Sequence, residues 1–206
     1  MRVLVTGGAG FVGKELVRAL RDDVDLLVVD TLRYGTPDWL QHGPEGFEFR
    51  HADIRDVDAI TDVVTGFGPD VVIHLAAIHY IPECDADPAN AVATNVAGTV
   101  NLLAACPPGT RFVFASSGAV YKPDEAPHRE FDSEIEPADI YGITKLQGET
   151  YVRALAAGRG LTGCIVRLFN VIGPGETNPH LLPALMDQLR KGADVIEVGN
   201  TWPKRD

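Results

Sequence analysis

Tyr141 and Lys145 have a spacing that suits acid–base chemistry. They lie four residues apart in a segment with helical periodicity, so both side chains project from one face of the predicted helix. A tyrosine phenol, with an ordinary pKa of about 10, is a poor base at neutral pH, but a nearby lysine ammonium favours the phenolate. The pair could therefore take a proton from a substrate hydroxyl. Such a pair also arises by chance, as a surface tyrosine beside a solvated lysine.

A hydroxyl side chain is expected close to this pair. Ser117 follows the apolar run Phe112–Ser116, which is typical of a buried strand, and the helix with Tyr141 comes next along the chain. A serine at the carboxyl end of a strand can meet the phenol of the next helix over one substrate oxygen. Serines at strand ends otherwise form turns and helix caps. We predict that Ser117, Tyr141 and Lys145 are the catalytic residues.

The first turn of the chain predicts a dinucleotide site. A strand, Val3–Thr6, leads into a glycine-rich turn, and a helix begins at about Gly10. Gly8, Gly10 and Gly13 fit the spacing G-x-G-x-x-G, and Gly7, Gly10 and Gly13 fit the variant G-x-x-G-x-x-G. Glycines allow the unusual backbone angles of this turn and the close approach of a pyrophosphate, to which the helix offers unpaired N–H groups. A glycine turn that only packs the helix on the strand is the alternative.

Asp30 indicates which dinucleotide binds. It ends the second apolar run, Leu26–Asp30, about 20 residues beyond the middle glycine, where a carboxylate accepts hydrogen bonds from the adenosine ribose. A carboxylate there would repel a 2′-phosphate, which favours NAD. Arg33 lies close enough to pair with a 2′-phosphate and so points the other way, towards NADP. Because Asp30 holds the diagnostic position, we predict NAD as the cofactor.

Alternating strands and helices must position these residues. The expected strands are Val3–Thr6, Leu26–Asp30, Phe47–His51, Val71–Leu75, Phe112–Ser116 and Gly163–Leu168. The expected helices are about Gly10–Arg21, Val57–Thr65, Pro88–Cys106 and Asp139–Ala157. Most strand candidates are continuous apolar runs, as in strands buried on both faces of a parallel sheet. The pattern predicts an α/β fold, a Rossmann-type doubly wound parallel sheet in the order 3-2-1-4-5-6.

The pattern changes near the end of the sequence. We expect residues 1–173 to form a dinucleotide-binding domain and residues 174–206 to begin a small substrate-binding domain that the chain does not complete. The second part holds a predicted helix, Leu181–Lys191, and a predicted short strand, Val195–Gly199.

Two polar loops are expected at the carboxyl ends of strands, where ligands bind in such sheets. They are Ile78–Asp87 and Lys122–Ala138. In the first loop, His79, Tyr80 and Glu83 could contact a substrate, or they could be solvated loop residues.

The composition indicates which binding partners and which cellular location to expect. The formal charge of −11 over 206 residues argues against nucleic acid as the main partner. No apolar run approaches the ~20 residues of a membrane span, and no leader opens the chain, so we expect a soluble, cytoplasmic protein without membrane contact. The odd, widely spaced cysteines Cys84, Cys106 and Cys164 fit reduced thiols. The histidines show no metal-ligand spacing with them, and we predict no metal.

Taken together, the motifs resemble those of the extended short-chain dehydrogenase/reductases, specifically the NAD-dependent nucleotide-sugar epimerase/dehydratase family. The resemblance covers essentially the whole chain. It rests on TGGAGFVG at the first turn, Asp30, His51-Ala52-Asp53-Ile54, His74-Leu75-Ala76-Ala77, Asn95-Val96-Ala97-Gly98-Thr99, Ser116-Ser117-Gly118-Ala119-Val120-Tyr121, Tyr141-Gly142-Ile143-Thr144-Lys145 and Arg167-Leu168-Phe169-Asn170-Val171.

The resemblance implies roles for particular residues. Those expected to bind NAD are Gly7, Gly10, Phe11, Val12, Gly13, Asp30, Asp53, Ile54, Leu75, Ala76, Ala77, Tyr141 and Lys145. Ser117 and Asn170 would contact the nucleotide-sugar substrate. The helices Pro88–Cys106 and Asp139–Ala157 would form the four-helix interface of a homodimer.

The resemblance also implies a reaction. Tyr141 would take the proton of a sugar hydroxyl, usually the 4-hydroxyl, while Lys145 lowers its pKa and Ser117 bonds the reacting oxygen. Dehydratases and decarboxylases of the family carry an acid just after the catalytic serine or threonine, where this chain has Gly118 and Ala119. We therefore expect a nucleotide-sugar 4-epimerase.

Three alternatives remain open at this point. The first is an NAD(P)H-dependent 4-ketosugar reductase, which would consume cofactor, and the second is another dehydratase or decarboxylase of the family. The third is a non-catalytic dinucleotide-binding protein, which would need no proton-transfer group. The residues do not identify the nucleotide or the sugar.

Overall fold

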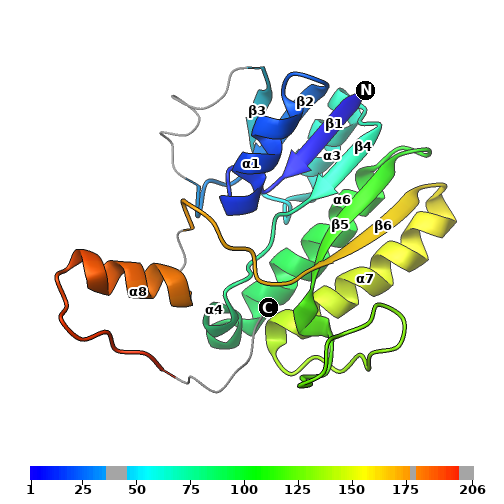
Figure 1. The fold of residues 1–206 in the computed structure, drawn as a ribbon. Helices are drawn as coiled ribbons and strands as arrows, with labels where there is room; N and C mark the ends of the chain where they lie inside the picture. The colour runs from blue at the N-terminus through cyan, green and yellow to red at the C-terminus, as the bar shows by residue number, and fades with distance from the viewer. Residues whose placement is uncertain (36–45, 177–179, 200–206) are drawn as a thin grey trace.

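A parallel sheet forms the centre of the computed structural model, which describes residues 1–35, 46–176 and 180–199 (Figure 1). The strands are β1 (Arg2–Thr6), β2 (Asp25–Asp30), β3 (Glu48–His51), β4 (Val71–His74), β5 (Arg111–Ser117) and β6 (Thr162–Leu168). In the described residues they form one six-stranded sheet in the order β3-β2-β1-β4-β5-β6, and every pair is parallel. The predicted Rossmann-type fold and strand order are confirmed.

In the described residues, helices follow β1, β3, β4 and β5 and cover both faces of the sheet (Figure 1). They are α1 (Phe11–Leu20), α3 (Val57–Phe67), α4 (Ile81–Ala86), α5 (Pro88–Val92), the π-helix η1 (Ala93–Ala97), α6 (Gly98–Ala105), the 3-10 turn η2 (Gly118–Val120), α7 (Ile140–Arg159) and α8 (Leu181–Arg190). The four helices predicted before the last domain are confirmed to within about two residues at each end. The third of them consists of α5, η1 and α6 in succession, with a π-helical turn in its middle.

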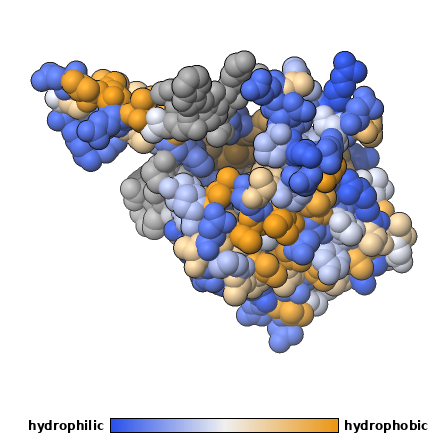
Figure 2. Space-filling view, turned by 90° about the horizontal axis from the view of Figure 1, so that it is seen from below, coloured by the Kyte–Doolittle hydropathy of each residue, from blue (hydrophilic) through white to orange (hydrophobic). Residues whose placement is uncertain are grey.

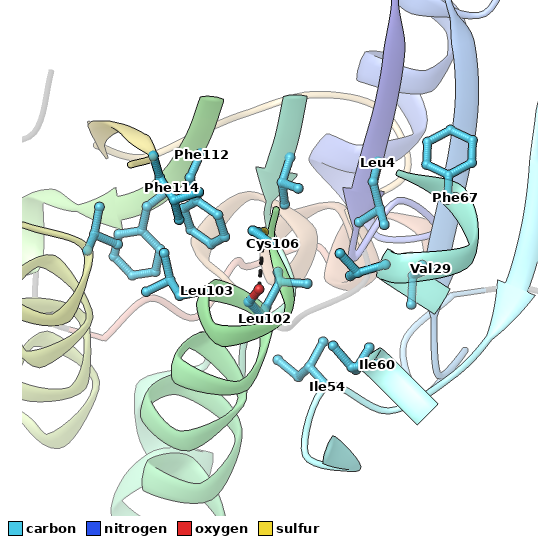
Figure 3. Close-up of a cluster of buried hydrophobic side chains, with 14 of the residues drawn as sticks. Leu4, Val29, Ile54, Ile60, Phe67, Leu102, Leu103, Cys106, Phe112 and Phe114 are labelled. Carbon is cyan, nitrogen blue, oxygen red and sulfur yellow. Dashed lines mark hydrogen bonds between the residues drawn. The ribbon is translucent and has the colours of Figure 1, made fainter. Parts of the chain in front are cut away.

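Alternate residues of the central strands point to opposite faces, which produces two cores. On one face, Leu4 of β1 and Phe112 of β5 pack with α3, α6 and α7 (Figure 3). On the other face, Val3 and Val5 of β1 pack against Val17 of α1. Because both faces of the central strands are covered, β1 and β2 are apolar along most of their length, as the sequence pattern indicated. The outer strands β3 and β6 are largely exposed.

Two predicted elements were wrong. The segment Ile78–Asp87 is not simply a loop, because α4 forms within it. Pro82 lies in the first turn of α4, where its missing N–H costs nothing, so the proline is compatible with the helix. Val195–Gly199 is not a strand in the structure. Its alternating apolar residues predicted one, but no strand of the described chain pairs with it.

The predicted helix Leu181–Lys191 is confirmed as α8, which stands apart from the main body (Figures 1 and 2). None of its side chains is buried, and Leu182, Met186 and Leu189 are all exposed. None of the helices in the described ranges is both long enough and apolar enough to cross a membrane.

Candidate functional site

The predicted site residues gather at one edge of the sheet, because the parallel strands all end there (Figure 1). They end or follow β1 (Gly7), β2 (Asp30), β3 (Asp53), β4 (Leu75), β5 (Ser117) and β6 (Asn170). The strand order reverses between β1 and β4, and ligands of such sheets bind beyond the carboxyl ends at this switch point.

The glycine turn has the geometry of a pyrophosphate site. Gly7 has a φ of +72°, in the left-handed region. A Cβ at Gly13 would lie 2.3 Å from the Gly7 carbonyl oxygen, so only glycine lets α1 pack this closely on the turn. Gly10 precedes α1, and no described side chain caps the helix there. The N–H groups of its first turn, which includes Phe11 and Val12, are therefore left for an anion.

Asp30 is fixed beside this turn. Its Oδ2 accepts a hydrogen bond from the Ala9 N–H at 3.0 Å, and its Oδ1 accepts one from the Leu32 N–H at 2.7 Å. Leu32 has a φ of +58°, a left-handed conformation that is uncommon for leucine. Each oxygen keeps a second lone pair, so the carboxylate can still accept hydrogen bonds from a ribose.

The segment after β4 runs directly beside the glycine turn. The Leu75 N–H donates to the Thr6 carbonyl oxygen at 3.0 Å, which extends the pairing of β1 and β4. A Cβ at Gly7 would lie only 2.6 Å from the backbone nitrogen of Ala76. The segment Leu75–Ala77, predicted to bind NAD, thus follows β4 directly beside the glycine turn.

The side chains of Asp53 and Ile54 have different surroundings. Arg55 donates to both oxygens of Asp53, from Nε at 3.0 Å and from Nη2 at 2.5 Å, and this hydrogen bonding lowers the pKa of the Asp53 carboxyl. The Ile54 side chain is buried, and a Cβ at Gly98 would lie 2.6 Å from its Cδ1. Since that side chain belongs to the core, only the backbone of Ile54 could face a cofactor.

His74 is a buried polar residue that the sequence pattern did not single out as part of the site's frame. Its Nδ1 lies 2.6 Å from the Thr6 hydroxyl, and its Nε2 lies 2.9 Å from the Thr99 hydroxyl. Thr99 already donates to the Asn95 carbonyl oxygen, so Nε2 donates and Nδ1 accepts. Burial, with the nearby Lys145 charge, lowers the pKa of His74 to about 3. This neutral imidazole connects β1, β4 and α6.

Tyr141 and Lys145 lie together at the start of α7. The Asp139 carboxylate accepts from the Gly142 N–H at 2.7 Å and caps the helix, which places Tyr141 in its first turn. The Lys145 Nζ lies 5.8 Å from the centre of the Tyr141 ring and donates to the Ala115 carbonyl oxygen at 2.8 Å. The spacing of four residues therefore brings the phenol and the ammonium to one place.

Ser117 completes the group from the neighbouring strand. It ends β5, and its Oγ accepts a hydrogen bond from the Ala119 N–H at 3.1 Å. It also forms a side-chain hydrogen bond with Tyr141. The three predicted catalytic residues are thus brought together, and the alternative of separate surface residues does not describe this site.

The electrostatics of the group follow from its burial. Desolvation raises the pKa of Tyr141 to about 12, although the Ser117 hydrogen bond acts to lower it. Desolvation also lowers the pKa of Lys145 to about 8. At neutral pH the free protein therefore holds a neutral phenol beside a lysine that is still mostly protonated.

Glu149 is a second residue that the sequence reading missed. It is fully buried on α7, one turn beyond Lys145. The Ser116 hydroxyl donates to it at 2.6 Å, Arg167 donates from Nε and Nη2 at 2.8 Å each, and Arg153 donates at 2.8 Å. Burial alone would raise the pKa of Glu149, but these donors lower it overall. The carboxylate ties α7 to β5 and β6.

Asn170 stands at the outer end of the edge. It is exposed, and it follows β6 two residues after Leu168, the strand partner of Ser117. It therefore lies at the same carboxyl end of the sheet as Ser117.

The residues of the loop after β4 have partners within the protein. The His79 ring stacks on His180, with ring centres 6.0 Å apart, and Tyr80 meets the same ring edge-on at 5.8 Å. Glu83 accepts hydrogen bonds from Arg33 and Tyr34. Glu83 thus contacts the turn after β2.

Comparison with known proteins identifies the family. The model of the NAD dependent epimerase/dehydratase family matches residues 3–206. The chain is 37% identical over 187 residues to a UDP-glucose 4-epimerase of Mycolicibacterium smegmatis, covering 87% of this chain and 59% of that protein. It is 32% identical to a dTDP-glucose 4,6-dehydratase of Streptomyces niveus, covering 100% of this chain and 64% of that protein.

A solved structure agrees with these matches. The UDP-glucose 4-epimerase of Thermus thermophilus, determined in complex with NAD, superimposes with a TM-score of 0.83 at 30% identity, covering 95% of this chain and 64% of that one. The chain spans about half to two thirds of the length of the curated relatives it matches. With a glycine turn, an anchored Asp30 and a Ser117–Tyr141–Lys145 group at one sheet edge, the chain belongs to the NAD-dependent epimerase/dehydratase family.

Proposed function

We propose that the protein is an NAD-dependent nucleotide-sugar 4-epimerase that acts through a transient 4-keto sugar. The observation that carries the proposal is the grouping of Ser117, Tyr141 and Lys145 at the same carboxyl end of the sheet as the glycine turn. A protein that only bound a dinucleotide would need the turn but no buried phenol and ammonium at its edge.

The residues present fit NAD. A Cβ at Gly7 or Gly13 would clash with neighbouring backbone atoms, so the glycines allow the tight turn that leads into α1. The first turn of α1 offers N–H groups to a pyrophosphate, and Asp30 presents acceptors for a ribose. Asp53, the Ile54 backbone and the segment Leu75–Ala77 would hold the rest of the cofactor. When bound, NAD supplies the hydride acceptor and later the hydride donor.

Tyr141 would be the base that takes the proton of the 4-hydroxyl. With a pKa of about 12, ionising the phenol at pH 7 costs on the order of 7 kcal/mol. That pKa already includes the hydrogen bond of Ser117, which acts to lower it. The Lys145 ammonium lies 5.8 Å from the ring centre and favours the phenolate. Tyr141 would therefore act as the base only in the substrate complex, where it takes the proton of the 4-hydroxyl as the phenolate.

The position after Ser117 favours epimerisation over elimination. Elimination needs a further acid or base for the neighbouring carbons, and neither Gly118 nor Ala119 carries one. A Cβ at Gly118 would lie 2.7 Å from Cε1 of Phe169, so a side chain at this position would have to displace the Phe169 ring. A 4-keto sugar that turns in the site would take a hydride from the reduced cofactor on its other face, and its oxygen would need only a proton from Tyr141 and a hydrogen bond from Ser117.

We also propose the assembly and the location. A nucleotide-sugar would be the substrate, and two copies of the chain would pair through the helices from α5 to α6 and through α7, where Val92 and Ile143 are exposed apolar residues. Residues 1–173 and 174–206 would belong to separate domains. A cytoplasmic location is supported by the free state of Cys84, Cys106 and Cys164.

A proton NMR time course tests the reaction. The protein is incubated with catalytic NAD and a panel of UDP- and dTDP-sugars, and we expect the 4-epimer to form without net reduction of the cofactor. Tyr141→Phe should slow conversion by about a thousandfold while NAD still binds. Tyr151→Phe, on the half-exposed side of the same helix, is the matched control and should keep its activity. Stoichiometric use of NAD(P)H would identify a 4-ketosugar reductase instead, and full activity of Tyr141→Phe would remove Tyr141 as the base.

A further inference from the structure

Arg33 lies three residues beyond Asp30, where an arginine could bind the 2′-phosphate of NADP. In the structure its guanidinium is already engaged. Nη2 donates to Oε1 of Glu83 at 2.5 Å, and Glu83 belongs to α4, 50 residues further along the chain. The arginine is thus tied to another element of the fold.

Tyr34 makes a second contact with Glu83. The Tyr34 hydroxyl also lies within hydrogen-bond distance of both Glu83 oxygens, at 2.6 and 2.5 Å, and the guanidinium carbon of Arg33 lies 5.3 Å from the centre of the Tyr34 ring. Burial, together with the Glu83 hydrogen bond, raises the pKa of Tyr34 well above its ordinary range. The Glu83 side chain is only 24% exposed, so its carboxylate is held in place by two neighbouring residues.

The contact joins segments on the two sides of β1. Arg33 follows β2 and Glu83 lies in α4, which follows β4, and these two strands flank β1 in the sheet. The turn after β2 packs on the glycine turn, since a Cβ at Gly35 would lie 2.7 Å from the Cβ of Ala9. The ion pair between Arg33 and Glu83 therefore links the turn that packs on the predicted dinucleotide site to α4.

We propose that Glu83 is a positioning residue for coenzyme choice, which holds Arg33 in an ion pair and so withholds its guanidinium from a 2′-phosphate. This inference rests on the proposed function, because it requires the dinucleotide site at the glycine turn. With Arg33 engaged, Asp30 alone faces the adenosine ribose and selects the free 2′-hydroxyl of NAD. If Glu83 lost its charge, Arg33 could turn to a phosphate, which it would bind with charge-assisted hydrogen bonds.

Binding of NAD and NADP to the protein and its variants tests this inference. Dissociation constants are measured by isothermal titration calorimetry, and the readout is the ratio of the NADP to the NAD constant. Charge-assisted hydrogen bonds to the phosphate should lower this ratio about tenfold in Glu83→Gln. The double variant Arg33→Ala/Glu83→Gln should return the ratio to its original value. Tyr34→Phe removes the other contact to Glu83 but leaves the ion pair, so its ratio should not change.

The outcomes separate this inference from the proposed function. An unchanged ratio in Glu83→Gln, with NAD still bound, would overturn the role of Glu83 and leave the NAD site intact. A lowered ratio that persists in the double variant would also overturn it, since the negative charge of Glu83 would then act without Arg33. Failure of the unmodified protein to bind either coenzyme would instead overturn the proposed function, and this inference with it. Circular dichroism of each variant verifies folding.

Discussion

The ammonium group of Lys145 is nearly fully buried and has one backbone acceptor, the Ala115 carbonyl oxygen. Water would solvate this charge better than the protein does, which is why burial lowers the pKa of Lys145 from 10.5 to about 8. Burial of the Lys145 ammonium beside Tyr141 therefore lowers the free energy of unfolding, and the size of this effect depends on pH.

Replacing this lysine should stabilise the fold while it removes activity. At pH 7 the charged form costs about 3 kcal/mol, and the lost hydrogen bond offsets about 1 kcal/mol, so Lys145→Met should be about 2 kcal/mol more stable. The cost is complete below pH 8 and fades as pH rises towards 10.5, because the unfolded chain then also loses the proton. Urea unfolding at pH 7 and pH 10 measures both effects. The exposed Lys191→Met is the control, and a less stable Lys145→Met would contradict the expectation.

The buried carboxylate of Glu149 should stabilise the folded protein, in contrast to the buried ammonium of Lys145. Its pKa is lower in the folded protein than in the unfolded chain, so its contribution is present above pH 4.5 and is lost as pH falls through the folded pKa. Glu149→Gln leaves Arg167 without its charge partner and should destabilise the protein by about 3 kcal/mol at pH 7. The difference from the unmodified protein should shrink in acid. Glu48→Gln, in an exposed pair with Arg50, should change unfolding by less than about 1 kcal/mol. Equal effects in both variants would show that burial does not distinguish them.

At the scale of elements, the start of α7 connects stability to the site. The Asp139 cap orders the turn that carries Tyr141. Asp139→Ala should cost about 1 kcal/mol of stability and should also reduce turnover, because the phenol would lose its fixed position. Asp56→Ala is a matched control, since Asp56 caps α3 through the Ala59 N–H at 3.0 Å, and α3 carries none of the predicted site residues. It should lose similar stability and keep its turnover. A parallel loss of turnover in both variants would contradict the local effect.

Elements were predictable where their pattern is local. The strand, glycine turn and helix around Gly7 are encoded within a dozen residues, and their types and order were predicted correctly. The helix α4 was missed because the long, polar segment Ile78–Asp87 suggested a loop. Glu149 and His74 were missed for another reason. Their partners, such as Ser116 and Thr6, lie 33 and 68 residues away, so only the topology of the sheet brings them together and buries them.

At the scale of the whole molecule, the contrast between the sheet and α8 leads to the last prediction. The central strands β1 and β4 are buried on both faces, whereas α8 is a ten-residue helix with no buried side chain. A helix this short is marginal in water without packing. Hydrogen exchange followed by mass spectrometry should therefore show rapid exchange in α8 and exchange only through global unfolding in β1 and β4.

Adding NAD should increase the difference in hydrogen-exchange protection between the carboxyl end of the sheet and α8. The cofactor would contact the glycine turn and the carboxyl edge, so protection should increase at Gly7–Gly13 and Leu75–Ala77, while α8 should be unaffected. The change at the turn tests the cofactor site, and the behaviour of α8 tests the proposed boundary after residue 173. If α8 were protected as strongly as β1 in the free protein, residues 174–206 would belong to the same cooperative unit as the sheet. The boundary would then be wrong even with the cofactor site intact, because the two readouts come from separate segments of the chain.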